Sequence, residues 1–127
     1  MSEALTGVRL LLVEDEAMVA MMVEDLLADM GCVVVDVAGT LSRGLALASD
    51  AGLPIDGAIL DVNLGGEKVY PVAEALAARG IPFIFATGYG IGGISETFSH
   101  VPALAKPYEQ RALERMLTDA LQGGREG

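Results

Sequence analysis

Residues 8–16 of the chain read VRLLLVEDE, an apolar run that ends abruptly in three acidic residues. Only Arg9 interrupts the apolar character, and a run of this kind is typical of a strand that is buried on both faces of a parallel sheet. Glu14, Asp15 and Glu16 then stand at the carboxyl end of that strand. This stretch therefore predicts a parallel β-sheet with acidic groups along one edge.

Strands and helices are predicted to alternate along the rest of the chain. Between Met18 and Met30 apolar residues recur at helical spacing with acids opposite, and Gly31 provides a stop. We expect the methionines of this helix to fill the core rather than to line a cofactor site. Further strands are predicted at residues 33–37, 56–60, 82–86 and 102–105, and further helices at residues 40–50, 67–79, 94–100 and 108–121.

The alternation of five strands with five helical segments predicts the fold class. Right-handed crossovers place helices on both faces of a parallel sheet. We therefore expect an α/β, flavodoxin-like fold: a doubly wound five-stranded parallel sheet with helices on both faces. In the second helix Thr40 is the expected cap, and Leu41, Leu45 and Ala48 are expected to share one face.

The composition fits one globular domain with a sizeable core. The chain has 127 residues, of which 52% are hydrophobic and 20% charged. Its net charge of −10, from 18 acids and 8 bases, disfavours binding to nucleic acid or to an anionic membrane. We expect neither a signal peptide nor a membrane span, because the apolar stretch near the N-terminus, Leu10 to Val13, is short and runs into acids. We expect a cytoplasmic monomer or weak dimer, one domain over residues 1–127 with its core at 7–122 and a flexible tail at 123–127.

Two residue types occur once each and limit the chemistry. Cys32 is the only cysteine, so no internal disulfide can form, and its apolar neighbours predict a buried, unreactive thiol. His100 is the only histidine, so no His-rich metal site exists, and a loop or surface position is expected for it.

The chemistry is predicted at the carboxyl ends of the strands, where open parallel sheets bind ligands. The first strand ends in Glu14–Glu16, the third in Asp61, the fourth in Thr87 and the fifth in Lys106-Pro107. Clustered carboxylates repel one another, and a hard cation such as Mg²⁺ relieves that repulsion. Beside such a cation Asp61 is suited to attack a phosphoryl donor, with Lys106 and Thr87 stabilising the transferred charge.

Four motifs at these strand ends resemble those of response-regulator receiver domains, the CheY-like family. The resemblance covers nearly the whole chain, and the motifs follow in the family's order. They are Leu12-Val13-Glu14-Asp15, Ile59-Leu60-Asp61-Val62-Asn63-Leu64, Ala86-Thr87-Gly88 and Ala105-Lys106-Pro107-Tyr108.

The resemblance implies roles for the acidic residues. Asp61 is implied to be the phosphoacceptor and also one of the ligands of the metal ion. Asp15 would bind Mg²⁺ directly, with Mn²⁺ as an alternative ion, and Glu14 would bind it directly or through water. The main-chain carbonyl of Asn63 would supply a further ligand.

The resemblance also implies roles at the ends of the fourth and fifth strands. Thr87 would bond a phosphoryl oxygen once Asp61 is modified, and Lys106 would pair with the phosphate. Gly88 and Pro107 would support the site, the proline after a cis peptide bond.

Departures from the common receiver pattern point to a subgroup. The loop at residues 63–66 lacks the usual proline, and Ala103 stands where an aromatic switch residue is common, with Tyr89 or Tyr108 as candidate replacements. Phe85-Ala86-Thr87-Gly88-Tyr89-Gly90, preceded by Pro82-Phe83, resembles the receivers known informally as FAT GUY. In that subgroup the proteins are often single domains whose fourth helix is poorly ordered. We expect phosphorylation to order residues 88–100 in place of a ring rotation.

The resulting hypothesis is a bacterial single-domain response regulator in a two-component phosphorelay. Asp61 would accept a phosphoryl group from a histidine kinase, of the HWE or a related class, or from a phosphotransfer protein. The chain would signal through altered protein–protein contacts and would be no enzyme beyond its own phosphorylation and dephosphorylation. The sequence leaves open whether it serves as a phosphate sink, a relay intermediate or an inhibitor.

Other interpretations of the same residues compete with this one. A Mg²⁺-dependent phosphohydrolase could use the same acidic edge, although such enzymes usually place the nucleophile in an Asp-x-Asp arrangement on the first strand. A degenerate receiver could bind partners without phosphorylation. Residues 88–93 fit the dinucleotide pattern G-x-G-x-x-G, but they follow the fourth strand and precede only a weak helix. Glu14, Asp15 and Glu16 could also simply be acids that the helix dipole stabilises at the start of a helix.

Overall fold

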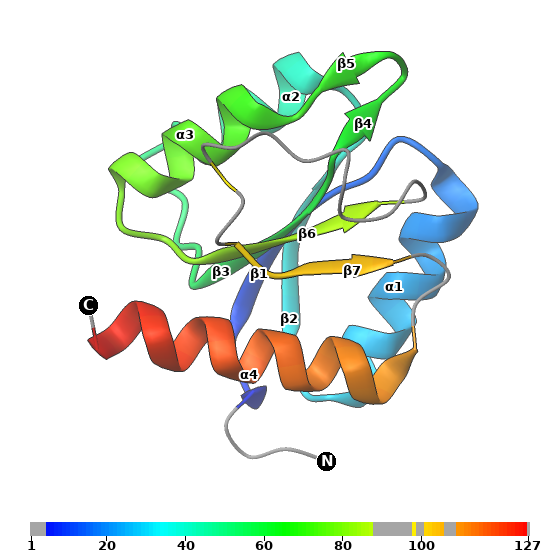
Figure 1. Ribbon diagram of the computed structural model, residues 1–127, viewed down its shortest axis with the longest axis vertical. Helices are drawn as coiled ribbons and strands as arrows, with labels where there is room; N and C mark the ends of the chain where they lie inside the picture. The colour runs from blue at the N-terminus through cyan, green and yellow to red at the C-terminus, as the bar shows by residue number, and fades with distance from the viewer. Residues whose placement is uncertain (1–4, 88–97, 99–100, 106–108, 127) are drawn as a thin grey trace.

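The structure, a computed structural model, describes residues 5–87, 98, 101–105 and 109–126. Within this part, five parallel strands form one sheet in the order β2-β1-β3-β6-β7 (Figure 1). The predicted flavodoxin-like fold is confirmed, and β3, which ends in Asp61, is the central strand. The strands are β1 (Arg9–Val13), β2 (Val33–Ala38), β3 (Gly57–Asp61), β6 (Phe83–Thr87) and β7 (Ala103–Ala105).

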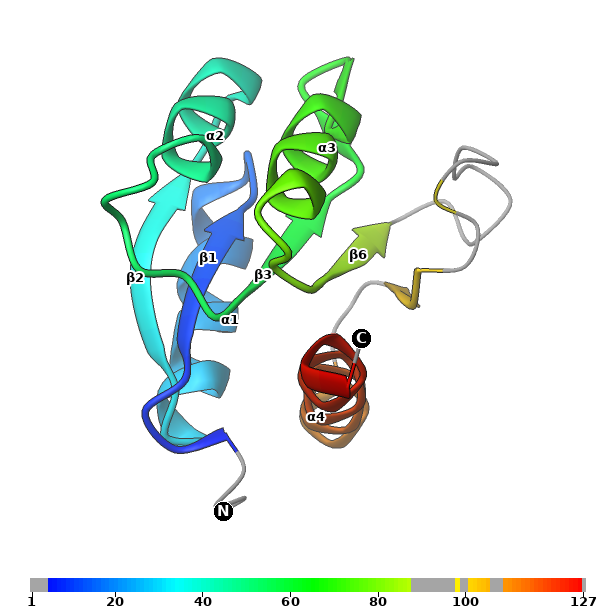
Figure 2. The ribbon, with the colours of Figure 1, turned by 90° about the vertical axis from the view of Figure 1, so that its left-hand side faces the viewer.

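Helices cover both faces of the sheet. In the described part of the chain, α1 (Ala17–Asp29) and α4 (Gln110–Glu126) pack on one face, and α2 (Leu41–Ala48) and α3 (Tyr70–Ala78) on the other (Figure 2). The helix predicted at residues 94–100 lies, apart from Phe98, outside the described residues.

The predicted end of the last helix is wrong. Helix α4 continues to Glu126 instead of stopping at Leu121. No proline follows Leu121, and glycine weakens a helix without necessarily ending it.

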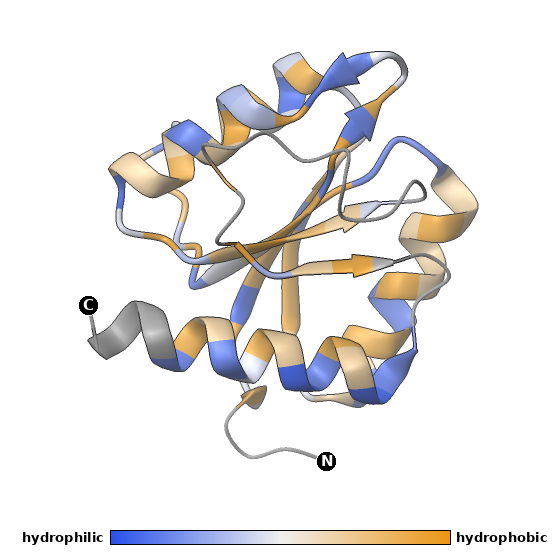
Figure 3. Ribbon diagram, in the orientation of Figure 1, coloured by the Kyte–Doolittle hydropathy of each residue, from blue (hydrophilic) through white to orange (hydrophobic). Residues whose placement is uncertain are grey.

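Successive residues of the inner strands enter two different cores. Leu10 and Leu12 of β1 pack toward α1 and α4, whereas Leu11 and Val13 pack toward α2 and α3. Apolar strands therefore lie between two helix layers (Figure 3). This double burial explains why β1 is apolar throughout after the exposed Arg9. None of the described helices combines the length and apolar character that a bilayer crossing needs.

The methionines of α1 do not all fill the core as predicted. Met30 is fully buried, but Met18, Met21 and Met22 are 84%, 64% and 40% exposed. The buried side of α1 is set by Ala20, Val23 and Leu27, whose spacing forms one helical stripe. The apolar residues of this helix surround more of its circumference than the sheet can cover, so three methionines remain at the surface.

Residues of the face predicted for α2 differ in burial. In α2 the buried residues are Gly44, Leu47 and Ala48, whereas Leu45 is 38% exposed. The predicted cap is confirmed, because the Thr40 hydroxyl accepts a hydrogen bond from the Arg43 amide at 3.2 Å.

A β-hairpin replaces the loop and the helix start predicted after Asp61. Strands β4 (Asn63–Leu64) and β5 (Glu67–Lys68) pair antiparallel, and α3 begins only at Tyr70. The turn residues Gly65 and Gly66 have φ values of 59° and 95°, and two consecutive left-handed residues are what a two-residue hairpin requires. The sequence prediction of a helix from Glu67 is therefore wrong at its first turn.

Candidate functional site

Three buried polar side chains mark the carboxyl edge of the sheet. Among the described residues, only Glu14, Asp61 and Thr87 combine a polar or charged side chain with burial, at 2%, 5% and 4% exposure. Glu14 follows β1, Asp61 ends β3 and Thr87 ends β6, and these strands are neighbours in the sheet. Burial of polar groups is costly unless they are hydrogen-bonded. Their concentration at one edge therefore indicates a functional site rather than a requirement of the fold.

Backbone amides hold the acidic side chains of this edge. The Asn63 amide donates to Asp61 Oδ1 at 3.2 Å, and the Glu16 amide donates to Glu14 Oε2 at 3.1 Å. The Gly65 amide donates to Asp15 Oδ2 at 3.0 Å. A backbone amide fixes a carboxylate without supplying a full positive charge, so these bonds orient the acids.

The carboxylates that follow β1 form a group with metal-ligand geometry. Oxygens of Glu14, Asp15 and Glu16 all lie within 4.8 Å of one another. Carboxylate oxygens are the hard donors that Mg²⁺ prefers, so the donor set fits that ion. Asp61 is not a member of this close group, and the sequence prediction had not included Glu16 among the ligands. The fold thus brings Asp61 to the same edge as the group but not into it.

Solved structures supply the comparison that identifies the family. SdrG from Sphingomonas melonis Fr1 is 48% identical to this chain, with coverage of 96% of this chain and 99% of SdrG and a TM-score of 0.79. A response regulator receiver domain protein (CheY-like) from Methanospirillum hungatei JF-1 has the same fold, with a TM-score of 0.81 at 23% identity over 96% of this chain and all of that one. The chain is a response-regulator receiver domain.

A second SdrG structure is also similar to this chain. SdrG from Pseudomonas melonis Fr1, solved in a BeF3-activated conformation, is 46% identical to this receiver over 94% of this chain and 99% of that chain, with a TM-score of 0.76. Neither a protein-family model nor a curated protein sequence matches this receiver. It is therefore placed in two-component signalling by its similarity to solved receivers.

Several predicted residues of this receiver lie outside the described part. Gly88, Lys106 and Pro107 are among them, and so are Tyr89 and Tyr108. The expectation that phosphorylation orders residues 88–100 concerns the same region, apart from Phe98, and stays a prediction.

Sequence reasoning missed an aromatic cluster beside the predicted switch position. Phe98 is buried, and its ring stacks on that of Tyr70 with a centroid distance of 5.7 Å. It also meets the rings of Phe83 and Phe85 edge-on at 6.0 and 5.9 Å. Ala103 pairs with Phe85 in the sheet and packs against the same core. The small side chain of Ala103 was the one signal in the sequence, and it had led to Tyr89 and Tyr108 as candidates rather than to Phe98.

The structure confirms the prediction that Cys32 is buried. The thiol is buried, and burial raises its pKa to about 11, with a further contribution from the Glu114 carboxylate. The pKa shift keeps the thiol protonated at neutral pH. Cys32 is therefore a core residue of this receiver and not a nucleophile.

Proposed function

We propose that this receiver is a single-domain response regulator that accepts a phosphoryl group on Asp61 from a histidine kinase or a phosphotransfer protein. The observation that carries the proposal is the burial of Glu14, Asp61 and Thr87 together at the carboxyl edge. The similarity to SdrG, for which a BeF3-activated structure exists, supports it because beryllium fluoride imitates a phosphoryl group on a carboxylate. We place the protein in the bacterial cytoplasm, as a monomer or weak dimer.

The roles we assign follow from the donor atoms at the edge. Asp15 would hold Mg²⁺ directly and Glu14 directly or through water, and Asp61 and the main-chain carbonyl of Asn63 would add further oxygens. The bound ion offsets the charge that gathers on the phosphoryl oxygens. An Asp61 carboxylate oxygen forms a bond to phosphorus while the bond from phosphorus to the donor breaks, and the donor leaves with its electron pair. Thr87 then donates its hydroxyl hydrogen to a phosphoryl oxygen.

Lys106, Gly88 and Pro107 complete the proposed site. The family resemblance assigns Lys106 to the phosphate, with Gly88 and Pro107 in support. A cation beside the phosphoryl group stabilises its negative charge.

The exposed methionines of α1 support a docking position for the phosphodonor. Helix α1 begins at Ala17, directly after the acidic group, and exposes Met18, Met21 and Met22 on its first two turns. Exposed apolar side chains that lie together are typical of interaction surfaces, and methionine adapts its shape to a partner. A phosphodonor that delivers its group to Asp61 has to approach this edge.

We assign the receiver to the FAT GUY subgroup, with a histidine kinase of the HWE or a related class as its donor. The described part of the motif, Phe83 and Phe85–Thr87, forms β6, and the aromatic cluster around Phe98 occupies the region beside Ala103. We propose that this cluster takes the place of the ring that Ala103 lacks.

The test is intact-mass analysis after incubation with acetyl phosphate and Mg²⁺. We expect a gain of one phosphoryl group that is lost without metal and lost in Asp61→Asn. If a purified kinase and acetyl phosphate both leave the mass unchanged, the receiver is degenerate and the proposal fails. Continuous turnover of a small phosphate ester that disappears in Asp61→Asn would instead favour the phosphohydrolase.

A further inference from the structure

The β4–β5 hairpin connects three polar groups of the site through short hydrogen bonds. At its base the Asn63 amide donates to Asp61 Oδ1 at 3.2 Å. At its tip the Gly65 amide donates to Asp15 Oδ2 at 3.0 Å. Within its turn the Gly66 amide donates to the Asn63 side-chain oxygen at 3.1 Å. One short hairpin therefore contacts carboxylates that follow two different strands of the sheet.

The hairpin has a buried base and an exposed tip. Leu64 and Val69 are buried, and the Val69 amide donates to the Val62 carbonyl at 3.0 Å. Gly65 and Gly66 are exposed and adopt left-handed backbone conformations. The tip is therefore held by its contact to Asp15 and by the Asn63 side chain that closes the turn.

The hydrogen bond from the Gly65 amide restricts the Asp15 side chain, which is otherwise exposed. An exposed carboxylate loses rotamer freedom when it binds an ion, and this loss opposes binding. A hydrogen bond to Oδ2 fixes the orientation in advance and leaves Oδ1 for a cation. Partners that orient a metal ligand in this way typically change metal affinity by about 10–100-fold when they are removed.

We propose that the Asn63 side chain is a positioning residue for the metal site: by closing the hairpin turn it holds the Gly65 amide against Asp15. The inference rests on the proposed function, in which Asp15 binds Mg²⁺. It is separate from the role of the Asn63 main-chain carbonyl, which every substitution at this position retains. The side chain acts on a ligand that follows another strand, through the backbone of the hairpin.

Two substitutions at position 63 isolate this role. Asn63→Ala removes the acceptor for the Gly66 amide, and Asn63→Ser offers a hydroxyl that can accept a similar local bond without adding charge. Thr40→Ala is a matched control, since Thr40 also accepts from the amide three residues on, at 3.2 Å, but in α2.

The experiment measures Mg²⁺ affinity by calorimetry and the Mg²⁺ dependence of phosphorylation by acetyl phosphate. We expect Asn63→Ala to raise both the dissociation constant and the half-saturating Mg²⁺ concentration about tenfold, the lower end of the range for such partners because the tip is exposed. At saturating Mg²⁺ the rate should return to within about twofold of the unsubstituted chain, since the reacting groups are intact. Asn63→Ser should recover most of the affinity.

The outcomes separate this inference from the proposed function. Equal Mg²⁺ affinity in Asn63→Ala and Thr40→Ala would overturn the inference, and so would a lower rate at saturating Mg²⁺ with no change in affinity. If the unsubstituted chain binds Mg²⁺ but gains no phosphoryl group, the proposed function fails. The Mg²⁺ dissociation constant of Asn63→Ala, compared by calorimetry with that of the unsubstituted chain, still decides the role of Asn63. Absence of Mg²⁺ binding to the unsubstituted chain would overturn both.

Discussion

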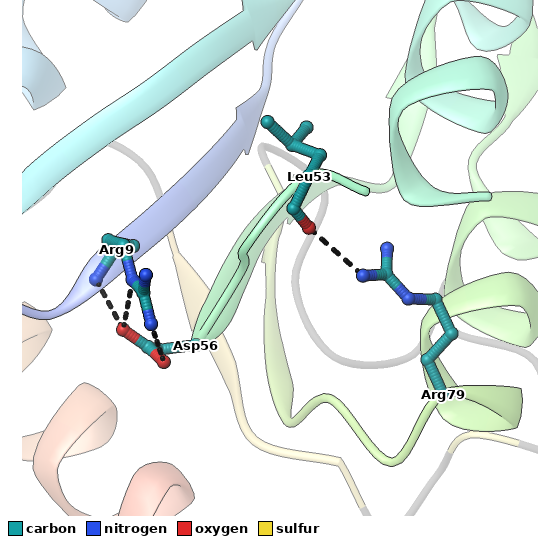
Figure 4. Close-up of polar contacts among 4 residues, drawn as sticks. All are labelled: Arg9, Leu53, Asp56 and Arg79. Carbon is teal, nitrogen blue, oxygen red and sulfur yellow. Dashed lines mark hydrogen bonds and ion pairs between the residues drawn. The ribbon is translucent and has the colours of Figure 1, made fainter. Parts of the chain in front are cut away.

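The hydrogen bonds described for acidic side chains differ between the two ends of strands β1 and β3. At the amino end, Asp56 pairs with Arg9: its carboxylate accepts from the Arg9 amide at 2.8 Å, from Nε at 3.2 Å and from Nη2 at 3.4 Å (Figure 4). At the carboxyl end, the Gly65 amide donates to Asp15, and the Asn63 amide is one of the groups that contact Asp61. An arginine neutralises the acid that it holds, whereas an amide only orients it.

Arg79 shows the same structural use of charge at the amino end. Its Nη1 donates to the Ala48 carbonyl at 2.8 Å and its Nη2 to the Leu53 carbonyl at 3.0 Å, the second of which is drawn in Figure 4. Charged groups here close the segment that precedes β3. The salt bridges Arg9–Asp56 and Arg43–Asp36, both among the described residues, include no member of the acidic group. At the amino end these charged contacts join segments of the fold, whereas binding at the carboxyl end belongs to the proposed function.

The largest difference between the two ends is expected when one acid at each end is neutralised. Asp61→Asn should abolish phosphorylation by acetyl phosphate, because an amide is no nucleophile toward phosphorus. Asp56→Asn should leave the phosphorylation rate within about twofold, since Asp56 lies at the opposite end of β3 from Asp61. Intact-mass time courses measure both. A fully phosphorylated Asp61→Asn chain would move the acceptor elsewhere.

The next largest effect concerns the metal. Asp15→Asn should raise the half-saturating Mg²⁺ concentration by about 100-fold, because a direct ligand contributes at least as much as the outer partners that typically change affinity by about 10–100-fold. The charge-matched control is Asp36→Asn, which removes one acid of the Arg43 ion pair outside the site. A similar shift in both variants would show that the half-saturating Mg²⁺ concentration depends on net charge and not on ligation by Asp15.

Much of this organisation could be predicted from the sequence, for physical reasons. A strand buried on both faces has to be apolar throughout, so β1 and β3 are visible as apolar runs that stop at Glu14 and Asp61. Parallel strands bring their carboxyl ends to one edge, so acids far apart in the sequence could be placed together. The edge of the site was therefore predictable as soon as the strands were.

The features that the sequence did not predict depend on contacts between distant segments, which the spacing of residues along the chain does not reveal. Residues 67–79 have helical spacing, which concealed the two-residue strands of the hairpin and with them the Gly65 contact to Asp15. The aromatic cluster joins Tyr70 and Phe98 across the fold. The α1 pattern showed how many apolar residues the helix has but not how much of it the sheet covers.

A smaller effect, on stability, should have opposite signs at the two ends. Without Mg²⁺, Asp15→Asn should raise the free energy of unfolding by about 0.5 kcal/mol, because it reduces repulsion among clustered carboxylates. Asp56→Asn should lower it by about 1 kcal/mol, since the partly exposed Arg9 loses its charged partner. Urea unfolding of both variants without metal measures the difference. Changes of the same sign would remove the distinction between the two ends.

The smallest effect is expected at Cys32, which precedes β2 at the amino end. Its pKa is raised from about 9.0 to about 11, chiefly by burial, so the folded chain keeps the thiol protonated where an exposed thiol begins to ionise. The raised pKa contributes stability that is fully present below about pH 9 and is lost as the pH rises through about 11. At neutral pH, Cys32→Ala should therefore leave phosphorylation unchanged.

Thiol labelling measures the same property directly. At neutral pH we expect iodoacetamide to label the folded chain at least about 100-fold more slowly than the chain in urea, because thiolate is the reacting species and two pKa units change its fraction about 100-fold. Equal labelling rates in the two states would mean that the amino end exposes a reactive group. Slow labelling, together with a phosphorylation rate that does not respond to Cys32→Ala, would place the reactive chemistry of this receiver at the carboxyl end of the sheet.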